Sequence, residues 1–223
     1  MAMGLRLMAA GIPFTIFEKG PEVGGTWRDN RYPGLSIDVP SPLYTFAGHR
    51  HPGWQRWMPD QPEILDYHRD VATRTGLREH IRFDSEVLAA TWTGTEWAVE
   101  TAAGSERFRV LVCASGFLHH PRVPEIAGLD DFAGDLVHSA RWRDEIVTDG
   151  RRVGVIGNGS TGVQLVCALS GSASHVTMFQ RTPQWIIPLL NFGIPGLVRR
   201  VGASERLVAG LLWFADWFVG GAS

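Results

Sequence analysis

The stretch that most constrains the fold of this chain lies between residues 152 and 181. Two apolar runs flank a glycine-rich segment and an apolar helical segment, in the order Val153–Ile156, Gly157–Gly162, Val163–Leu169 and His175–Phe179. This order predicts a strand, a glycine loop, a helix and a second, parallel strand. The glycines permit a tight turn and a close approach of the backbone to a pyrophosphate, while the helix N-terminus supplies N–H groups. The sequence therefore predicts a dinucleotide site.

The residue that closes this unit indicates which dinucleotide it binds. Arg181 follows the second strand, about twenty residues beyond the loop, where NAD-binding units usually carry an acidic residue. A guanidinium at this point can pair with the 2'-phosphate of NADP. A glycine loop that holds no nucleotide is the alternative.

The composition is that of a globular protein with a small-molecule partner. Of 223 residues, 44% are hydrophobic and 20% are charged, and the net charge of -2 argues against nucleic acid or an anionic membrane as a partner. Cys113 and Cys167 lie far apart in apolar segments, which favours reduced cysteines in a cytoplasmic protein. The histidine pairs at positions 49 and 51 and at 119 and 120 lack zinc-ligand spacing, so we predict no metal site.

One segment raises the question of a membrane. Leu207–Val219 is apolar, but it contains Asp216 and is shorter than the ~20 residues of a spanning helix. We therefore expect a helix that packs on protein, with a shallow membrane contact as the alternative. Residues Met1–Ala10 contain Arg6 and no small-residue cleavage site, which argues against a signal peptide.

The first part of the chain has the pattern of a second dinucleotide unit without its beginning. Gly4–Ala10 predicts a helix that Gly11 and Pro13 stop, and a short strand, Phe14–Phe17, ends at Glu18. An acid at this point of a dinucleotide fold holds a ribose hydroxyl, whereas a solvated surface acid is the alternative. No strand and glycine loop precede the helix, so we expect this unit to start inside its helix.

The middle of the chain predicts a loop, a helix and an antiparallel sheet. Gly24–Pro42 is rich in Gly, Pro, Asn and Asp, and Glu63–Thr75 has a helical pattern. Three strand-like segments follow, with tight turns at Gly94-Thr95 and Gly104-Ser105, and these strands are Glu86–Thr93, Glu96–Thr101 and Glu106–Ala114. They predict a β-meander within an α/β frame, and residues 121–149 are expected to form a linker.

Two spaced patterns add a family resemblance. The first, (A/G)GxWxxxx(F/Y)P(G/M)xxxD, is matched by Gly24-Gly25-Thr26-Trp27, Tyr32-Pro33-Gly34 and Asp38. The second, FxGxxxHxxxW, is matched by Phe132, Gly134, His138 and Trp142. Both resemble the patterns of Baeyer-Villiger monooxygenases, within the flavin-containing monooxygenases. Over most of residues 1–185 the chain is similar to this family, and Trp142 favours the Baeyer-Villiger enzymes over N- and S-oxidising relatives.

The resemblance implies an enzyme that binds FAD and NADPH and uses O2 to oxygenate a ketone or a soft heteroatom through a peroxyflavin. The FAD residues that it implies are Glu18 at the ribose, Gly25, Thr26, Trp27, Arg28 and Asp29 beside the flavin, Asp38 and Tyr44 near its rings, and Val87 at the adenine. For NADP it implies Gly157, Asn158, Gly159, Ser160, Thr161, Gly162 and Gln164 at the pyrophosphate, and Arg181 and Thr182 at the 2'-phosphate.

The catalytic residue implied within this chain is Asp38, a carboxylate that can orient an arginine beside the reacting oxygen species. The family's arginine would lie beyond Ser223. The linker residues Phe132, Gly134, His138 and Trp142 are implied to couple cofactor binding to domain movement. From the residue types alone, Asp38 can equally be a turn carboxylate, His138 a side chain bonded to backbone, and the tryptophans core aromatics.

These patterns predict an α/β fold with two Rossmann-like dinucleotide-binding domains. Residues 1–120 would form a partial FAD-binding domain that lacks its opening strand and glycine loop and carries the meander. Residues 121–150 would form the linker, and residues 151–223 an NADP-binding domain, incomplete at its C-terminus, with a helical tail. The alternatives are an N- or S-oxidising flavin monooxygenase, and an inactive fragment that at most binds NADP.

Overall fold

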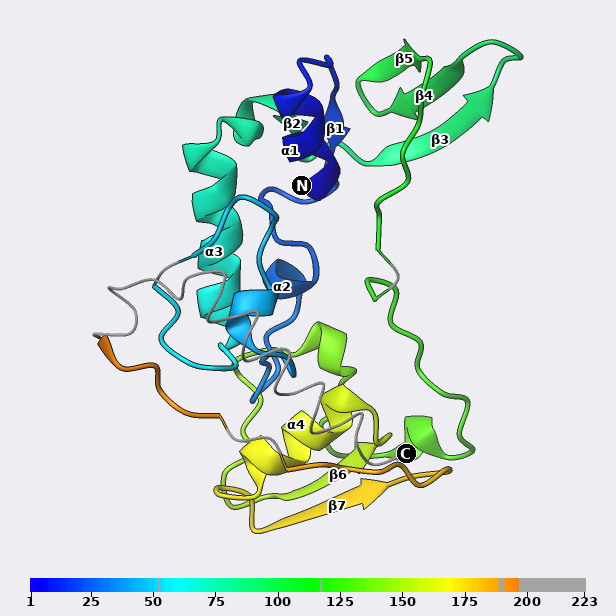
Figure 1. The fold of residues 1–223 in the computed structure, drawn as a ribbon. Coiled ribbons are helices and arrows are strands. Elements are labelled where there is room, and N and C mark those ends of the chain that lie inside the picture. Colours follow the sequence, from blue (N-terminus) through cyan, green and yellow to red (C-terminus); the bar gives the residue numbers. More distant parts are fainter. Residues whose placement is uncertain (52, 117, 189–190, 197–223) are drawn as a thin grey trace, which may run out of the picture.

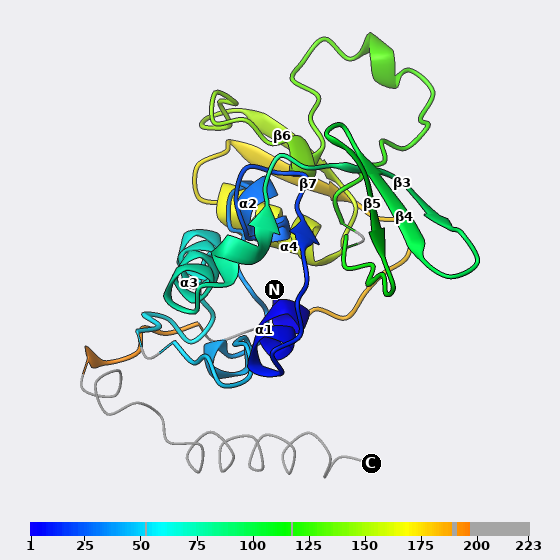
Figure 2. The same cartoon turned by 90° about the horizontal axis from the view of Figure 1, so that it is seen from above.

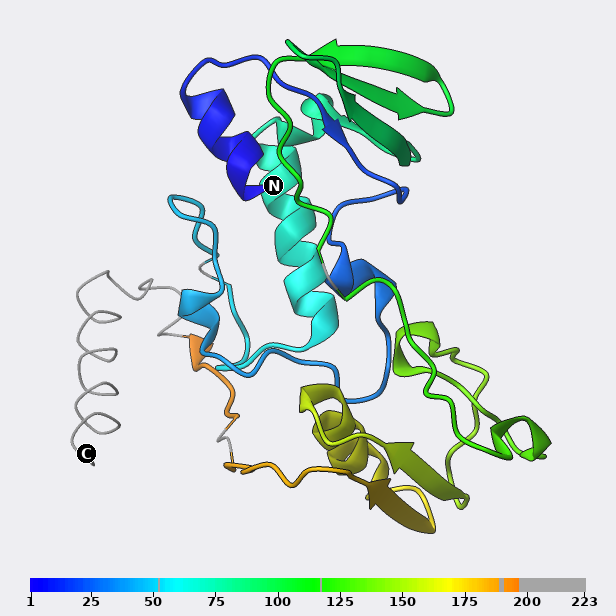
Figure 3. The ribbon, with the colours of Figure 1, turned by 90° about the vertical axis from the view of Figure 1, so that its right-hand side faces the viewer.

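The computed structural model of the chain describes residues 1–51, 53–116, 118–188 and 191–196. Figure 1 shows helices and strands gathered at two ends, with helices α2 (Thr26–Asp29) and α3 (Gln61–Arg74) between them. One end carries helix α1 (Ala2–Ala9) and an antiparallel sheet. The other carries a strand–helix–strand unit, and the view from the side in Figure 3 has the same arrangement.

The strand–helix–strand unit consists of β6 (Arg152–Ile156), α4 (Ser160–Leu169) and β7 (His175–Phe179). The two strands are parallel, from Arg152 opposite His175 to Ile156 opposite Phe179. This confirms the predicted order of elements. Helix α4 begins at Ser160 rather than at Val163, because the last residues of the glycine segment already form its first turn.

The N-terminal unit follows the prediction in outline and differs in its strands. Gly11 follows helix α1 with a φ of +65°, as expected of a glycine stop. Strand β1 is shorter than predicted, Ile16–Phe17, because its parallel partner β2 (Ile81–Arg82) also has only two residues. The sequence did not predict β2, since so short a strand has no periodicity of its own.

The antiparallel sheet contains β3 (Val87–Trp92), β4 (Trp97–Thr101) and β5 (Gly104–Phe108) in that order. The β-meander is confirmed, but the predicted third strand, Glu106–Ala114, is wrong in its bounds. Gly104 pairs with Thr101, so it lies inside β5 and the turn falls at residues 102–103. The ladder ends at Trp97 opposite Phe108, because β4 starts there and offers no partner to later residues. Residues 109–116 leave the sheet (Figure 2).

The sequence predicts that Gly24–Pro42 is a loop, whereas the structure has the short helix α2 within this segment. Gly24 and Gly25 have φ angles of +111° and +49°, and they reverse the chain just before that helix. The N–H groups of Trp27 and Arg28 then donate to the carbonyls of Gly24 and Gly25, each at 3.0 Å. A 3-10 helix, Ser41–Leu43, ends the segment.

Two apolar clusters hold these elements together. The first surrounds α3 and includes the fully buried residues Ile64, Val71 and Leu77. The second joins the glycine-rich segment to the strand–helix–strand unit, and consists of Tyr32, Leu35, Val155, Leu165 and Leu169. The second cluster positions the predicted site, because it packs the segment of the first pattern directly on α4.

The sequence predicts neither a membrane-spanning helix nor a metal site. The apolar segment Leu207–Val219 lies outside the described residues. Within the ranges that the structure describes, no helix is both long enough and apolar enough to span a bilayer. In the same ranges no three His, Cys, Asp or Glu side chains gather as metal ligands would.

Candidate functional site

The glycine loop joins the C-terminal end of β6 to helix α4. Gly157 has a φ of +111°, and its N–H donates to the carbonyl of Phe179 in β7 at 2.9 Å. A Cβ on Gly162 would collide with the carbonyl oxygen of Gly157, whereas a Cβ on Gly159 would meet no atom within 4 Å. The loop is therefore tight at its base and open at the start of α4. An open backbone at a helix N-terminus fits a pyrophosphate.

Asn158 connects this loop to the end of β7. Its Nδ2 donates to Oε1 of Gln180 at 2.9 Å and to the carbonyl of Thr182 at 2.8 Å. Arg181 lies between these partners and is exposed. The sequence singles out Asn158 as a pyrophosphate ligand, whereas its side chain here holds the Arg181 segment beside the loop. Gln180 is a partner that the sequence did not single out as a site residue.

The segment of the first pattern is hydrogen-bonded to α4. Tyr32 donates to Oε1 of Gln164 at 2.9 Å and accepts from the hydroxyl of Thr161 at 3.2 Å. Nε2 of Gln164 donates to the carbonyl of Ser36 at 3.0 Å. The structure thus brings residues predicted for NADP into contact with the segment predicted to line the flavin. The sequence did not identify these contacts, because they join residues more than 120 positions apart.

Gly34 allows this close contact between the segment and the helix. Its φ is +80°, and a Cβ there would lie 2.8 Å from the carbonyl oxygen of Gln164 and 2.9 Å from Cβ of Ala168. Both the backbone conformation and the space therefore require glycine at this position. Contact with α4 thus explains Gly34, one of the glycines that match the first pattern.

Glu18, the predicted ribose ligand, follows β1 and is held in place by its neighbours. Its Oε1 accepts from the N–H of Gly20 at 2.8 Å and from Nη1 of Arg28 at 3.1 Å, while Oε2 takes part in neither contact. Arg28 also pairs with Asp29 at 2.7 Å and donates to the carbonyl of Glu22. The hydrogen bond to Asp29, together with that to Glu18, raises the pKa of Arg28. Glu18 is thus an oriented carboxylate immediately after β1.

Two of the predicted flavin-side residues, Trp27 and Tyr44, are in contact. Nε1 of Trp27 donates to the hydroxyl of Tyr44 at 2.9 Å, and the two rings meet edge to face. Burial raises the pKa of Tyr44 and of Tyr32, and the charge of Asp38 raises both further. Asp38 itself is exposed. Of the other flavin-side residues, Thr26 and Asp29 are exposed on α2, and Val87 is 40% exposed at the start of β3.

The four residues of the second pattern do not converge on one site. The ring of Phe132 folds over Gly134, whose Cβ would lie 2.6 Å from it, and Phe132 is 60% exposed. Nδ1 of His138 accepts from the N–H of Ala140 at 3.1 Å and caps a short 3-10 helix. Trp142 packs against the second apolar cluster. His138 is thus bonded to backbone, and Trp142 is a partly buried aromatic beside the cluster that joins the first-pattern segment to α4.

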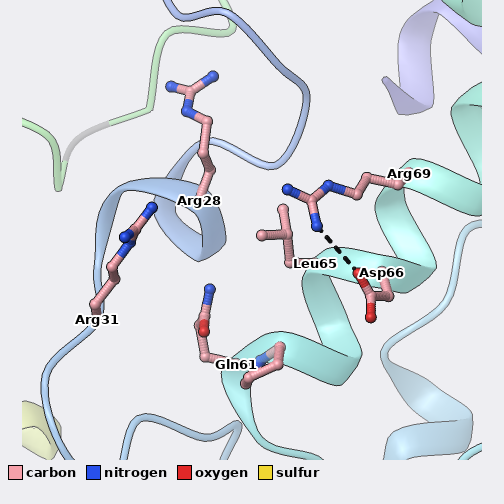
Figure 4. A pocket seen from close by; sticks show the side chains of 7 residues that line it. Arg28, Arg31, Gln61, Leu65, Asp66 and Arg69 are labelled. Atoms are coloured by element: carbon pink, nitrogen blue, oxygen red, sulfur yellow. Dashed lines mark hydrogen bonds and ion pairs between the residues drawn. The ribbon is translucent and has the colours of Figure 1, made fainter.

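A cavity of about 330 Å³ lies between α2 and α3 (Figure 4). Its charged lining comes from three arginines and one acid, which are Arg28, Arg31, Arg69 and Asp66. Arg69 donates to Asp66 at 3.1 Å, and Arg28 is already paired with Glu18 and Asp29, so much of this positive charge is neutralised within the protein. We therefore place the candidate site along the glycine loop and the first-pattern segment.

Comparison with known proteins identifies relatives of the chain. The pyridine nucleotide-disulphide oxidoreductase family matches residues 1–188. An uncharacterized monooxygenase of Mycobacterium tuberculosis is 52% identical over 79% of this chain and 36% of its own length. A Baeyer-Villiger monooxygenase of Streptomyces coelicolor is 42% identical over 96% of this chain and 42% of its own length. A phenazine N-monooxygenase of Lysobacter antibioticus is 39% identical over 80% of this chain and 34% of its own length.

Solved structures of monooxygenases are also similar to this chain. The OTEMO complex with FAD and NADP superposes with a TM-score of 0.84 at 32% identity, over 94% of this chain and 42% of that one. A cyclohexanone-bound cyclohexanone monooxygenase gives a TM-score of 0.82 at 34% identity, with the same coverage of 94% and 42%. The chain therefore spans about two fifths of the length of these proteins.

Proposed function

The chain belongs to the pyridine nucleotide-disulphide oxidoreductase family, and from this premise we propose that it is part of a flavin-dependent monooxygenase of Baeyer-Villiger type and carries parts of two cofactor sites. Residues 1–120 are assigned to FAD, residues 121–150 to the linker and residues 151–223 to NADPH. The reaction proposed for the whole protein is the oxygenation of a ketone with NADPH and O2. The observation that carries this proposal is the contact of the first-pattern segment with α4, because a hydride passes only between adjacent cofactors.

For NADPH, the residues of this chain fit the cofactor at its pyrophosphate and at its 2'-phosphate. The open backbone at Gly159 and the N-terminus of α4 would hold the pyrophosphate, and Arg181 with Thr182 would hold the 2'-phosphate. Asn158 supports the second contact, because it ties the Arg181 segment to the loop. Ser160 and Thr161 begin α4 and bring their N–H groups to the same end of the helix.

For FAD, the proposed ligands lie from Glu18 to Val87. Glu18 would accept a ribose hydroxyl at Oε2, and α2 would lie beside the flavin with Trp27 and Tyr44 packed together. When bound, the flavin supplies the redox chemistry, accepting a hydride from NADPH and reacting with O2. Asp38 would hold negative charge near the flavin rings and orient a cationic side chain that stabilises the oxygen anion.

A competition between dinucleotides tests the NADPH assignment in the purified chain. Isothermal titration should give tighter binding of NADP⁺ than of NAD⁺, and Arg181→Gln should weaken NADP⁺ binding by about tenfold to a hundredfold, the value of one or two hydrogen bonds to a charged group. Arg152→Gln, an exposed arginine at the opposite end of β6, is the matched control and should bind NADP⁺ as the parent does. Equal affinity of the parent for the two dinucleotides would overturn the assignment.

A second candidate function is N-oxidation, which the similarity to a phenazine N-monooxygenase favours. The two reactions are separated by their products. The complete protein, supplied with NADPH and O2, should convert a cyclic ketone to a lactone if the first proposal holds, and a tertiary or aromatic amine to an N-oxide if the second does. Before either product assay, desalting should show whether the protein retains flavin, because neither reaction proceeds without it.

A further inference from the structure

The hydroxyl of Tyr32 forms the centre of a polar contact between two segments of the proposed cofactor sites. It receives the hydroxyl proton of Thr161 at 3.2 Å and gives its own to Oε1 of Gln164 at 2.9 Å. Thr161 is in the first turn of α4 and Gln164 is in the second. Tyr32 thus contacts the helix turns at the proposed pyrophosphate site without belonging to the glycine loop.

Gln164 is oriented by the protein at both ends of its amide. Oε1 accepts from Tyr32, and Nε2 donates to the carbonyl of Ser36. Both partners belong to the first-pattern segment, which also carries Asp38. The amide is therefore engaged by this segment, and its position depends on the tyrosine hydroxyl.

The hydroxyl of Tyr32 makes these hydrogen bonds in a buried environment. Tyr32 is 7% exposed, and its ring is part of the second apolar cluster. Burial raises its pKa, as does the charge of Asp38, so the hydroxyl stays protonated and able to donate at neutral pH. A buried hydrogen bond that loses one partner leaves the other without compensation, and here that partner is Gln164.

We propose that Tyr32 is a positioning residue for NADP, which fixes the first two turns of α4 through Thr161 and Gln164. The inference rests on the proposed NADP site and adds to it a residue outside the glycine loop. Gly34 supports it independently, because its backbone lies so close to Gln164 and Ala168 that the segment and the helix form one packed unit. Loss of the Tyr32 hydroxyl would then change the pyrophosphate site through Thr161 and Gln164, although Tyr32 itself is not proposed to contact the cofactor.

Tyr32→Phe tests the proposal because it removes the hydroxyl and keeps the ring in the cluster. The first pattern accepts either Phe or Tyr at this position, so the variant is expected to fold. Titration with NADP⁺ should show affinity weakened by about threefold to tenfold, the value of one buried hydrogen bond. Tyr67→Phe is the matched control, since that buried hydroxyl also makes two hydrogen bonds, to the N–H of Phe46 and the carbonyl of His49.

A double-mutant cycle tests whether Tyr32 acts through Gln164. Gln164→Met keeps the length of the side chain and removes both amide groups. In that background Tyr32→Phe should weaken NADP⁺ binding less than it does in the parent, because the contact with Gln164 is already gone and only the contact with Thr161 remains to be lost. Thermal unfolding of all variants gives the independent measurement of stability, which a purely structural role would change in Tyr32→Phe and Tyr67→Phe alike.

The outcomes separate this proposal from the one on which it rests. If the parent chain binds no NADP⁺, the NADP site itself is wrong and the role of Tyr32 falls with it. If the parent binds NADP⁺ and Tyr32→Phe binds it equally well, the NADP site stands and the positioning role is wrong. Equal weakening by Tyr32→Phe and Tyr67→Phe would also overturn it, since of these two tyrosines Tyr32 is the one whose hydroxyl is bonded to α4.

Discussion

Nη1 of Arg28 lies 3.1 Å from Oε1 of Glu18, and the same guanidinium holds Asp29 and the carbonyl of Glu22. The side chains of Arg28 and Glu18 are only 14% and 29% exposed, so this ion pair is shielded from solvent. One arginine therefore fixes the chain between β1 and α2. The residue predicted to bind a ribose is positioned before any ligand arrives.

Replacing Arg28 by Met should destabilise the protein by about 1.5–3 kcal/mol, the range for hydrogen bonds to charged groups. The matched control is Lys19→Met, which removes the exposed ion pair between Lys19 and Glu86, with side chains 65% and 54% exposed. Its effect should stay within about 0.5 kcal/mol. Urea unfolding of the two variants measures the difference, and equal losses would show that the Arg28 contacts contribute no more than a surface pair.

Gly34→Ala should be among the most destabilising glycine substitutions in the chain. The variant combines a positive φ with a clash against the backbone of Gln164, and we expect a loss of about 2–4 kcal/mol. Gly76→Ala isolates the first effect, because Gly76 has a similar φ of +74° and a Cβ there would meet no atom within 4 Å. That control should lose only about 1–2 kcal/mol. Chemical denaturation followed by tryptophan fluorescence compares them, and a Gly34→Ala loss no larger than the control would contradict the close contact.

The two loop glycines Gly159 and Gly162 should respond to alanine in opposite ways. A methyl group at Gly162 collides with the Gly157 carbonyl, so Gly162→Ala should lower stability by about 2–3 kcal/mol. At Gly159 the methyl meets nothing within 4 Å, so stability should change by less than about 1 kcal/mol. Gly159→Ala should nevertheless weaken NADP⁺ binding by about tenfold or more, because the methyl blocks the approach of a pyrophosphate. Unfolding and NADP⁺ titration together check both, and a Gly159→Ala variant that binds normally would argue against a pyrophosphate there.

The order of elements from β6 to β7 was predictable because it depends on local features. The apolar runs, the loop glycines and the length of the helical segment lie within thirty residues, and each constrains its neighbours. Predictions were less accurate where the determinant is a distant partner. Strand β2 has two residues and exists only because β1 lies beside it. The bounds of β5 depend on where β4 begins and ends, because Phe108 lies opposite Trp97 and Gly104 opposite Thr101, so the glycine at position 104 could not fix the turn by itself.

The same difference between local features and distant partners explains which parts of the candidate site could be predicted from the sequence. The sequence identifies Gly162 and Gly157 by their spacing, and the clash at Gly162 gives the physical reason for that spacing. It also contains Tyr32 within a pattern, but the contact with Gln164 spans 132 positions and has no local signal. Glu18 is found from its place after a strand, while its ion pair with Arg28 depends on the turn that the chain makes between them.

Stability should fall as the pH drops from about 7 to about 5, in part because of His68 on α3. Burial lowers the pKa of His68, and the nearby amino terminus acts in the same direction, against the hydrogen bond between Nδ1 and the Ile64 carbonyl at 2.8 Å. The folded state therefore binds a proton less readily than the unfolded state, whose histidine titrates near about 6.5. The free energy of unfolding that this group contributes is complete above that pH and is lost as the pH falls through the folded pKa.

His68→Gln should flatten this pH dependence, although it lowers stability at pH 7 by removing the ring that packs against Phe46. The relevant quantity is the slope of unfolding free energy against pH, which one proton can change by at most about 1.4 kcal/mol per pH unit. Urea unfolding at a series of pH values measures the slopes. An unaltered slope in His68→Gln would mean that His51, whose pKa burial also lowers, or other groups carry the dependence.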